Sequence, residues 1–241
     1  MNTARTAAEV RLDEIVCGGA ATDVYLADQA RLLLEELDSF VERINRTGIG
    51  KQFLASLQGV LQRELILSLC RLYEPYSTRN PGRSLPATTH HLRTEAAGIR
   101  VINRRSLMKF LGDADESRQA LDQLSDEQLS LALADYLDSR MPQADPGSTQ
   151  PLDRALAQLK TARDKAIAHH DRVSQASLLF PGWTHVVHLI RSARETVTLV
   201  ADVYVSVSFN LAGDASAAPG SLRRLLNRAG LDENAAPGAM Q

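Results

Sequence analysis

The feature that most constrains this chain is a run of leucines at helical spacing between residues 51 and 73. They recur every three or four positions, which is the period of one face of an α-helix. The members are Leu54, Leu57, Leu61, Leu65, Leu69 and Leu72. From Leu65 to Cys70 the sequence is apolar nearly all round, so this half of the helix has to lie in the middle of a core. Pro75 ends the helix.

Other segments carry similar helical signals. The spacing of apolar residues predicts helices over residues 22–45 and 88–110, and the second is weakened at Gly98. Residues 125–128 read Ser-Asp-Glu-Gln, a capping box that starts a short helix. Pro151 suits the first position of a further helix, which continues to about residue 171.

Residues 197–209 are ambiguous because they alternate and are rich in β-branched side chains, which is typical of a strand. The same region offers Val197, Val200, Val203 and Val207 at helical spacing. No second strand is evident to pair with it, and an isolated strand leaves its backbone groups unsatisfied. We therefore predict a long helix over residues 181–210 and an all-α fold.

The predicted organisation has three parts. Residues 1–21 form a flexible N-terminal segment, residues 22–211 form one helical domain, and residues 212–241 form a flexible tail rich in Ala, Gly and Pro. Within the tail, residues 221–229 form an additional short helix that is basic and amphipathic. Aromatic residues make up only 5% of the chain, so the core has to be built from aliphatic side chains, which suits helix packing.

Charge and cysteine content narrow the classes of function. The chain has 27 basic and 29 acidic residues and a formal net charge of -2, so it has no overall attraction to nucleic acid or to an anionic membrane. A site for a polyanion therefore has to be local. Cys17 and Cys70 have no disulfide or zinc spacing. The sequence shows no signal peptide and no apolar stretch expected to cross a bilayer, so we expect a cytoplasmic protein without a membrane partner.

Residues 163–171 concentrate charged and titratable side chains at the end of an amphipathic helix. These side chains are Arg163, Asp164, Lys165, His169, His170 and Asp171. In a regular helix, positions 163 and 170 lie within about 20° of one face, whereas position 169 is displaced by roughly 120°. Regular geometry therefore favours His170 as the partner of Arg163.

Arginine and histidine together suit the cleavage of RNA without a metal ion. Histidine titrates near neutrality and can take the proton of a 2′-hydroxyl or protonate the leaving 5′-oxygen. Arginine can bind the phosphate through two hydrogen bonds and stabilise the charge that develops on its oxygens. The alternative is a charged helix end in which a histidine simply lies near the negative end of the helix dipole.

Other candidate motifs carry less information. Residues 48–51 read Gly-Ile-Gly-Lys but lack the remaining elements of a phosphate-binding loop. His90 and His91 are adjacent and point to different faces of a helix. His185 and His188 share a face but have no cysteine or carboxylate nearby to complete a metal site. We expect no metal and no cofactor.

The 163–171 segment resembles a motif of the HEPN superfamily, in which an arginine is followed by a histidine after four to six residues. More narrowly, Arg163-Asp164-Lys165-x-x-Ala168-His169-x-Asp171 is similar to the Arg-(Asp/Asn)-Lys-x-x-Ala-His-x-Asp pattern of AbiU-like abortive-infection HEPN proteins. The stretch Leu69-Cys70-Arg71-Leu72-Tyr73-Glu74 is similar to the Ala-Arg-Leu-(Tyr/Phe)-Asp stretch of the upstream helix in that group. Glu74 stands where Asp is more usual, and Cys70 where a small residue is usual.

The resemblance implies a HEPN-like helical bundle in which the motif helix packs beside the core helix. It also implies a homodimer whose two motifs line one cleft, with Arg163 and His169 in the catalytic roles. This choice of histidine differs from the one that regular helix geometry favours, and it requires a local distortion of the helix. His170 is kept as a possible second participant, and Asp164, Lys165 and Asp171 as supporting residues.

Two classes of function follow. The first is a metal-independent endoribonuclease with RNA as substrate, acting as a toxin or an antiphage effector, with an antitoxin or another defence protein as a possible partner. The second is a non-catalytic HEPN-like module that binds a nucleotide or a protein partner. The near-neutral charge and the absence of a broad basic surface fit the second class better.

Overall fold

The structure is a computed structural model that describes residues 4–79, 81–111, 122–168, 180–207, 209 and 217–231. Every regular element in these ranges is a helix, which confirms the predicted all-α class. His169, His170 and Asp171, the last three residues of the motif, lie outside the described residues. Positions 166–168 are described in their backbone only.

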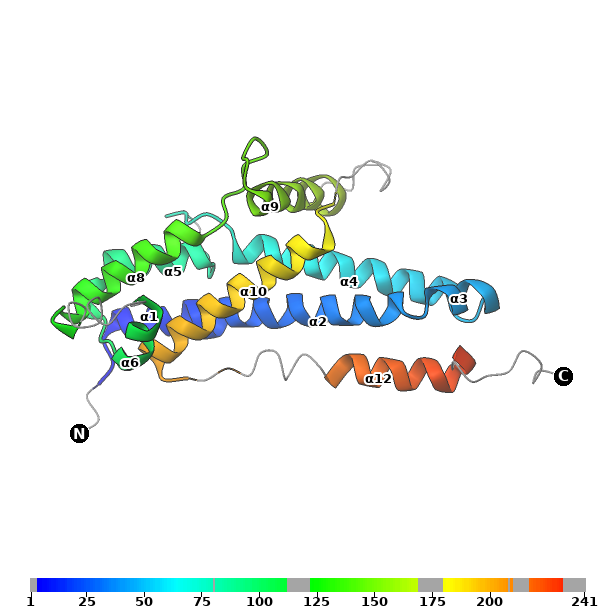
Figure 1. The fold of residues 1–241 in the computed structure, drawn as a ribbon, viewed down its shortest axis with the longest axis horizontal. Coiled ribbons are helices and arrows are strands. Elements are labelled where there is room, and N and C mark those ends of the chain that lie inside the picture. Colours follow the sequence, from blue (N-terminus) through cyan, green and yellow to red (C-terminus); the bar gives the residue numbers. More distant parts are fainter. Residues whose placement is uncertain are drawn as a thin grey trace.

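Two long antiparallel helices form the axis of the molecule (Figure 1). They are α2 (Ala21–Asp38) and α4 (Lys51–Leu72), joined by α3 (Val41–Thr47). Gly48 and Gly50 adopt positive φ angles of 70° and 62° in the turn before α4, a conformation that favours glycine. The helix expected over residues 22–45 is broken at Phe40, whose side chain is buried.

The second half of α4 is the centre of the core, as the leucine run predicts. Leu69, Cys70 and Leu72 have no exposed surface. By length and composition α4 is also long and apolar enough to cross a membrane, which the sequence reading does not anticipate. The core helix of a soluble protein passes the same test, and in the described structure Leu65, Ile66, Leu69, Cys70 and Leu72 are buried against the other helices of the bundle.

Helix α10 (Trp183–Val200) crosses α2 and α4 obliquely and continues as a π-helix, Ala201–Val205 (Figure 1). This confirms the choice of a helix over a strand for this region. Val197, Val200 and Val203 are buried because they share the face that packs on the bundle.

Shorter helices cover one end of this axis. They are α1 (Ala7–Ile15), α5 (Leu85–Thr94), α6 (Arg104–Leu111) and α8 (Asp126–Arg140). The capping box that was read at residues 125–128 is present, since the Ser125 hydroxyl accepts from the Gln128 N–H at 3.2 Å and the Gln128 side chain accepts from the Ser125 N–H at 2.9 Å. Helix α9 (Pro151–Ala162) lies against α4.

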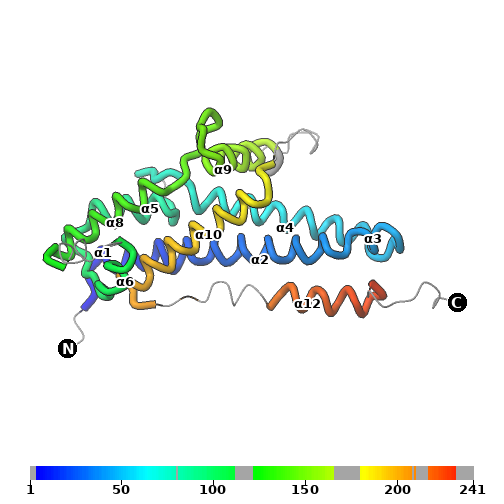
Figure 2. The backbone as a smooth tube through the Cα atoms, viewed as in Figure 1, coloured from blue at the N-terminus to red at the C-terminus, as the bar shows by residue number. Residues whose placement is uncertain are grey.

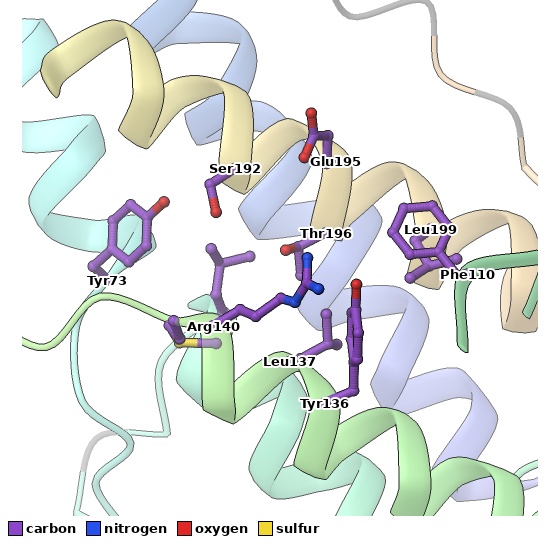
Figure 3. A pocket seen from close by; sticks show the side chains of 11 residues that line it. Tyr73, Phe110, Tyr136, Leu137, Arg140, Ser192, Glu195, Thr196 and Leu199 are labelled. Carbon is purple, nitrogen blue, oxygen red and sulfur yellow. The ribbon is translucent and has the colours of Figure 1, made fainter. Parts of the chain in front are cut away.

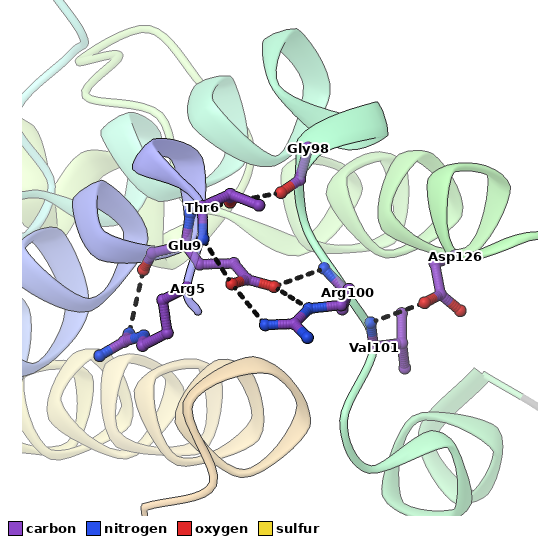
Figure 4. A network of polar contacts seen from close by, with 7 residues as sticks. All are labelled: Arg5, Thr6, Glu9, Gly98, Arg100, Val101 and Asp126. Atoms are coloured by element: carbon purple, nitrogen blue, oxygen red, sulfur yellow. Dashed lines mark hydrogen bonds and ion pairs between the residues drawn. The ribbon is translucent and has the colours of Figure 1, made fainter. Parts of the chain in front are cut away.

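The prediction of a flexible N-terminal segment is wrong for its described part. Residues 7–15 form α1, which begins with a capping box between Thr6 and Glu9. Arg100 donates from Nε and Nη2 to the two carboxylate oxygens of Glu9, at 2.6 and 2.9 Å (Figure 4). Together with the burial of Leu12 and Ile15, these contacts attach α1 to the bundle.

The prediction of one helix over residues 88–110 is also wrong. Helix α5 ends at Thr94, and a 3-10 turn, Ala96–Gly98, leads into an extended segment before α6. In this extended segment the side chain of Ile99 is buried, and the next side chain, Arg100, forms an ion pair with Glu9 of α1. The tertiary contacts of this segment therefore outweigh its helical periodicity.

The short basic helix expected in the C-terminal tail is present as α12 (Ala217–Leu226), followed by a π-turn, Asn227–Leu231. It lies along α2 rather than apart from the bundle (Figures 1 and 2). Arg223 donates to both carboxylate oxygens of Glu36 at 2.8 and 2.7 Å. Leu226 and Leu231 are buried in a second apolar cluster, whose other buried members are Leu37, Phe40, Ile44 and Leu54.

Candidate functional site

The helix that carries the 163–171 motif is anchored by its apolar face. Helix α9 begins at Pro151 and buries Ala155, Leu156, Leu159 and Ala162 in the main core. Immediately after Ala162 the hydrogen bonding changes to that of a π-helix, Arg163–Ala168. Short π segments often occur at functional sites, but the described residues contain three others, Val16–Ala20, Ala201–Val205 and Asn227–Leu231, so this one does not mark a site by itself. The helix is thus distorted where the motif begins, and the angle calculated for a regular helix does not apply across residues 163–168.

Arg163 is the first residue of this distorted turn, and its side chain is 27% exposed. Its Nε donates a 2.8 Å hydrogen bond to Oδ1 of Asp164. This bond raises the pKa of the guanidinium, and partial burial opposes the shift. Arg163 therefore stays cationic at the protein surface, where an anionic group can approach it.

Glu74 is the residue through which the core helix meets the motif. It is the second residue after α4, and its Oε1 lies 3.8 Å from Nη1 of Arg163. Its backbone carbonyl accepts a 2.8 Å hydrogen bond from Oγ of Ser84, the N-cap of α5. The two stretches that carry the family resemblance thus face each other in space. Nothing local in the sequence connects positions 74 and 163, so the role of Glu74 beside Arg163 is visible only in the tertiary structure.

Cys70 lies on the buried face of α4, close enough to Arg163 for the charge of the guanidinium to act on its thiol. Burial raises the pKa of its thiol to about 11, although the nearby charges of Arg163 and Lys160 act in the opposite direction. The thiol is therefore protonated at neutral pH and unsuited to act as a nucleophile or metal ligand. Cys70 serves as a small apolar residue that lets α9 approach α4 closely.

Tyr73 and Arg71 point away from Arg163. Tyr73 is buried, and its hydroxyl donates a 2.7 Å hydrogen bond to the backbone carbonyl of Leu189 on α10. Burial raises its pKa far above the usual range. Arg71 binds Asp23 of α2 and Glu64 of its own helix, at 2.7 and 3.0 Å. These residues hold the end of α4 in place and do not contribute to the candidate site.

A small cavity lies beside Tyr73, between α4, α8 and α10 (Figure 3). Its volume is about 60 Å³, enough for roughly two water molecules, since each occupies about 30 Å³ in the liquid. Arg140 reaches over it and stacks on Tyr136 with 4.5 Å between guanidinium carbon and ring centre. The cavity is too small for a nucleotide and is separate from Arg163.

The remaining predicted site residues are placed as follows. Asp164 and Lys165 are exposed, and Asp164 is bonded to Arg163. His169, His170 and Asp171 lie outside the described residues, so the choice between the two histidines stays a prediction. Within the part of the chain that is described, no three His, Cys, Asp or Glu side chains gather in a way that would hold a metal ion.

Fold and site together define an all-α bundle in which a π-distorted motif helix presents an arginine to the end of a buried core helix. A family model described as AbiU2, of the HEPN group, matches residues 41–216 of this chain. The chain therefore belongs to the AbiU2 family of HEPN domains. No curated protein and no solved structure matches the chain.

The matched region includes α4, α9 and the whole 163–171 motif. It begins at α3, later than the start of the helical domain that was predicted at residue 22, so α1 and α2 precede it. Helix α12 follows it. Both flanking regions nevertheless pack on the matched helices in one structure.

Proposed function

We propose that this protein is a metal-independent endoribonuclease of the HEPN type that acts as a toxin or an antiphage effector. Membership of the AbiU2 family supports a defence or toxin module in general. The observation that carries the more specific proposal is Arg163, a cationic and partly exposed side chain on a distorted helix, directly opposite the core-helix stretch.

In the proposed reaction the 2′-hydroxyl oxygen of RNA attacks the adjacent phosphorus, and the bond to the 5′-oxygen breaks. Arg163 binds the non-bridging oxygens of the phosphate and stabilises their increasing negative charge. His169 transfers a proton, either from the 2′-hydroxyl or to the leaving 5′-oxygen. The products are a 2′,3′-cyclic phosphate and a 5′-hydroxyl end.

The reaction needs both a general acid and a general base, and we propose that two copies of the chain form the complete site that supplies them. In a twofold dimer each subunit presents the same surface, so two copies of the 163–171 motif can line one cleft. An antitoxin or another defence protein is the further partner in this scheme. The proposed location is the cytoplasm, where the RNA substrate is found.

One observation favours the alternative, a non-catalytic module that binds a nucleotide or a protein. Arg163 already has two carboxylates near it, Asp164 at 2.8 Å and Glu74 at 3.8 Å. A phosphate has to compete with both of them. An exposed ion pair is worth only about 0–1 kcal/mol, however, so this competition weakens phosphate binding without preventing it.

Incubation of the purified protein with a 5′-labelled single-stranded RNA in excess chelator tests the proposal. We expect cleavage with cyclic phosphate ends, and a loss of at least about 100-fold in rate for Arg163→Ala. The matched control is Arg154→Ala, since Arg154 is an exposed arginine on the same helix that donates, among the described residues, to the backbone carbonyls of Ser148 and Thr149. His169→Ala and His170→Ala identify the histidine that transfers the proton.

Cleavage that survives both Arg163→Ala and the two histidine substitutions would refute the proposal, as would the absence of cleavage by a correctly folded dimer. Sedimentation of the wild-type protein gives the oligomeric state independently. Activity from a monomer would refute the shared site while leaving the nuclease in place.

A further inference from the structure

A polar pocket of about 290 Å³ lies between α1, α5 and the loop that follows α4. Its polar and aromatic lining comprises Arg11, Tyr76, His90, His91, Thr94 and Glu95. None of these residues belongs to the 163–171 motif. The pocket contains His90 and His91, the adjacent pair that the sequence analysis set aside as ligands of a metal.

The pocket contains a ready-made aromatic stack. The rings of Tyr76 and His90 lie with centres 3.7 Å apart and planes inclined by only 16°. Tyr and His rings are among the surfaces on which unpaired RNA bases stack. The loop and α5 hold the two rings parallel before any ligand arrives, so a base that joins the stack requires little rearrangement.

The edges of the pocket carry both donors and acceptors. The ring nitrogen Nε2 of His91 lies 2.8 Å from the carbonyl oxygen of Ala8, so in the neutral ring Nε2 carries the proton and Nδ1 is left as an acceptor. Arg11 supplies donors, and its exposed pair with Glu14 on its own helix is weak enough to be exchanged. Glu95 supplies a carboxylate acceptor. A nucleobase edge needs such a mixture of partners.

The pocket is linked to the candidate site along the chain, through the residues that follow α4. Tyr76 follows Glu74 by two residues, so their Cα atoms are at most about 7 Å apart. The side-chain oxygen Oε1 of Glu74 in turn lies 3.8 Å from Nη1 of Arg163. The Ser84 hydroxyl donates a hydrogen bond to the Glu74 carbonyl and so joins the two ends of loop 74–84. This loop carries Tyr76 of the pocket at the end where Glu74 faces Arg163.

We propose that this pocket binds one base of the single-stranded RNA whose phosphate Arg163 holds. The base stacks on the Tyr76–His90 pair, and its edge contacts Arg11 and His91. This inference rests on the proposed ribonuclease function for its substrate, but it concerns recognition of the base and not cleavage. It predicts that the protein prefers RNA whose base at this position is unpaired.

The test uses the full-length protein and a fluorescent single-stranded oligonucleotide with 2′-O-methyl groups, which bind like RNA but cannot attack the phosphate. Tyr76→Ala is expected to weaken binding by about 5- to 100-fold, which corresponds to the loss of one stacked base. Tyr76→Phe keeps the stacking ring and is expected to bind as the wild type does. Phe53→Ala is the control, because Phe53 is an exposed aromatic residue at the far end of α4.

Thermal unfolding followed by circular dichroism shows whether each variant is folded. Equal binding by wild type and a folded Tyr76→Ala would overturn the inference, and so would binding of 5′-mononucleotides without binding of the oligonucleotide. If the protein cleaves RNA but binding does not depend on Tyr76, the pocket is refuted and the nuclease stands. If binding depends on Tyr76 but no RNA is cleaved, the pocket is supported and the nuclease is refuted.

Discussion

The buried carboxylate of Asp28 links α2 to α10, and its removal is expected to destabilise the whole bundle. Its side chain is only 2% exposed. One oxygen accepts from Arg31 at 2.8–2.9 Å, and the other accepts from Arg194 of α10. Arg31 and Arg194 are themselves only 16% and 28% exposed. Two guanidinium groups therefore share this one buried carboxylate.

Asp28→Ala leaves both guanidinium groups partly buried beside an uncharged methyl group. Breaking a buried ion pair by removing one partner costs about 3–5 kcal/mol. Arg31 keeps a second partner in Glu35, at 2.8 Å, so the value belongs at the lower end, about 3 kcal/mol. Asp28→Asn keeps the shape but removes the same charge and turns an N–H donor toward one of the two arginines, so it is expected to cost about as much, about 3 kcal/mol.

Urea unfolding followed by circular dichroism measures these differences as shifts of the midpoint at constant slope. The matched control is Asp135→Ala, because Asp135 also pairs with an arginine, Arg93, but is 73% exposed. Such a surface pair is worth at most about 1 kcal/mol. The reasoning is refuted if Asp28→Ala loses less than about 1 kcal/mol, or no more than the Asp135 control.

Three further predictions concern the ends of the bundle and the site. Arg100 lowers the pKa of Glu9 to about 2, so this ion pair stabilises the fold fully above pH 4.5 and progressively less as the pH falls to 2. Between pH 4.5 and pH 2 the urea midpoint of Glu9→Gln should therefore fall less than the midpoint of the wild-type protein, and an equal fall in both would contradict this. Glu74→Gln removes a competitor for Arg163, and fluorescence titration with a 2′-O-methyl oligonucleotide should show binding tighter by about 2- to 5-fold; weaker binding would contradict this. Tyr73→Phe deletes a buried hydrogen bond to α10 and should cost about 1 kcal/mol in urea unfolding, whereas an unchanged midpoint would show that the bond contributes nothing.

Local signals in the sequence account for most helix positions. The leucine run predicts α4 within a residue of its observed end, because that periodicity and the following proline act within a few positions. The capping box at Ser125 and the proline at position 151 mark the starts of α8 and α9 for the same reason. The capping box of Thr6 and Glu9 is equally local and was overlooked in a segment rich in small residues.

Contacts between distant segments account for what the sequence reading missed. Glu9 is 91 residues from Arg100, and Arg223 is 187 residues from Glu36. Neither ion pair can be predicted from the spacing of residues within either of the two segments that it joins. Local signals can therefore predict that the N-terminal segment and α12 are helical, but they cannot predict where these helices pack on the bundle.

Local patterns in the sequence are enough to predict the all-α class, the core helix α4 and the position of Arg163 near the end of an amphipathic helix. Each of these depends on the helical period or on a cap, which involve residues within about one turn of each other. Only the tertiary structure placed Glu74 opposite Arg163 and introduced the π-turn that begins there. That arrangement arises where α9 packs on α4, so it depends on the shape of two helices in contact, which no single segment encodes.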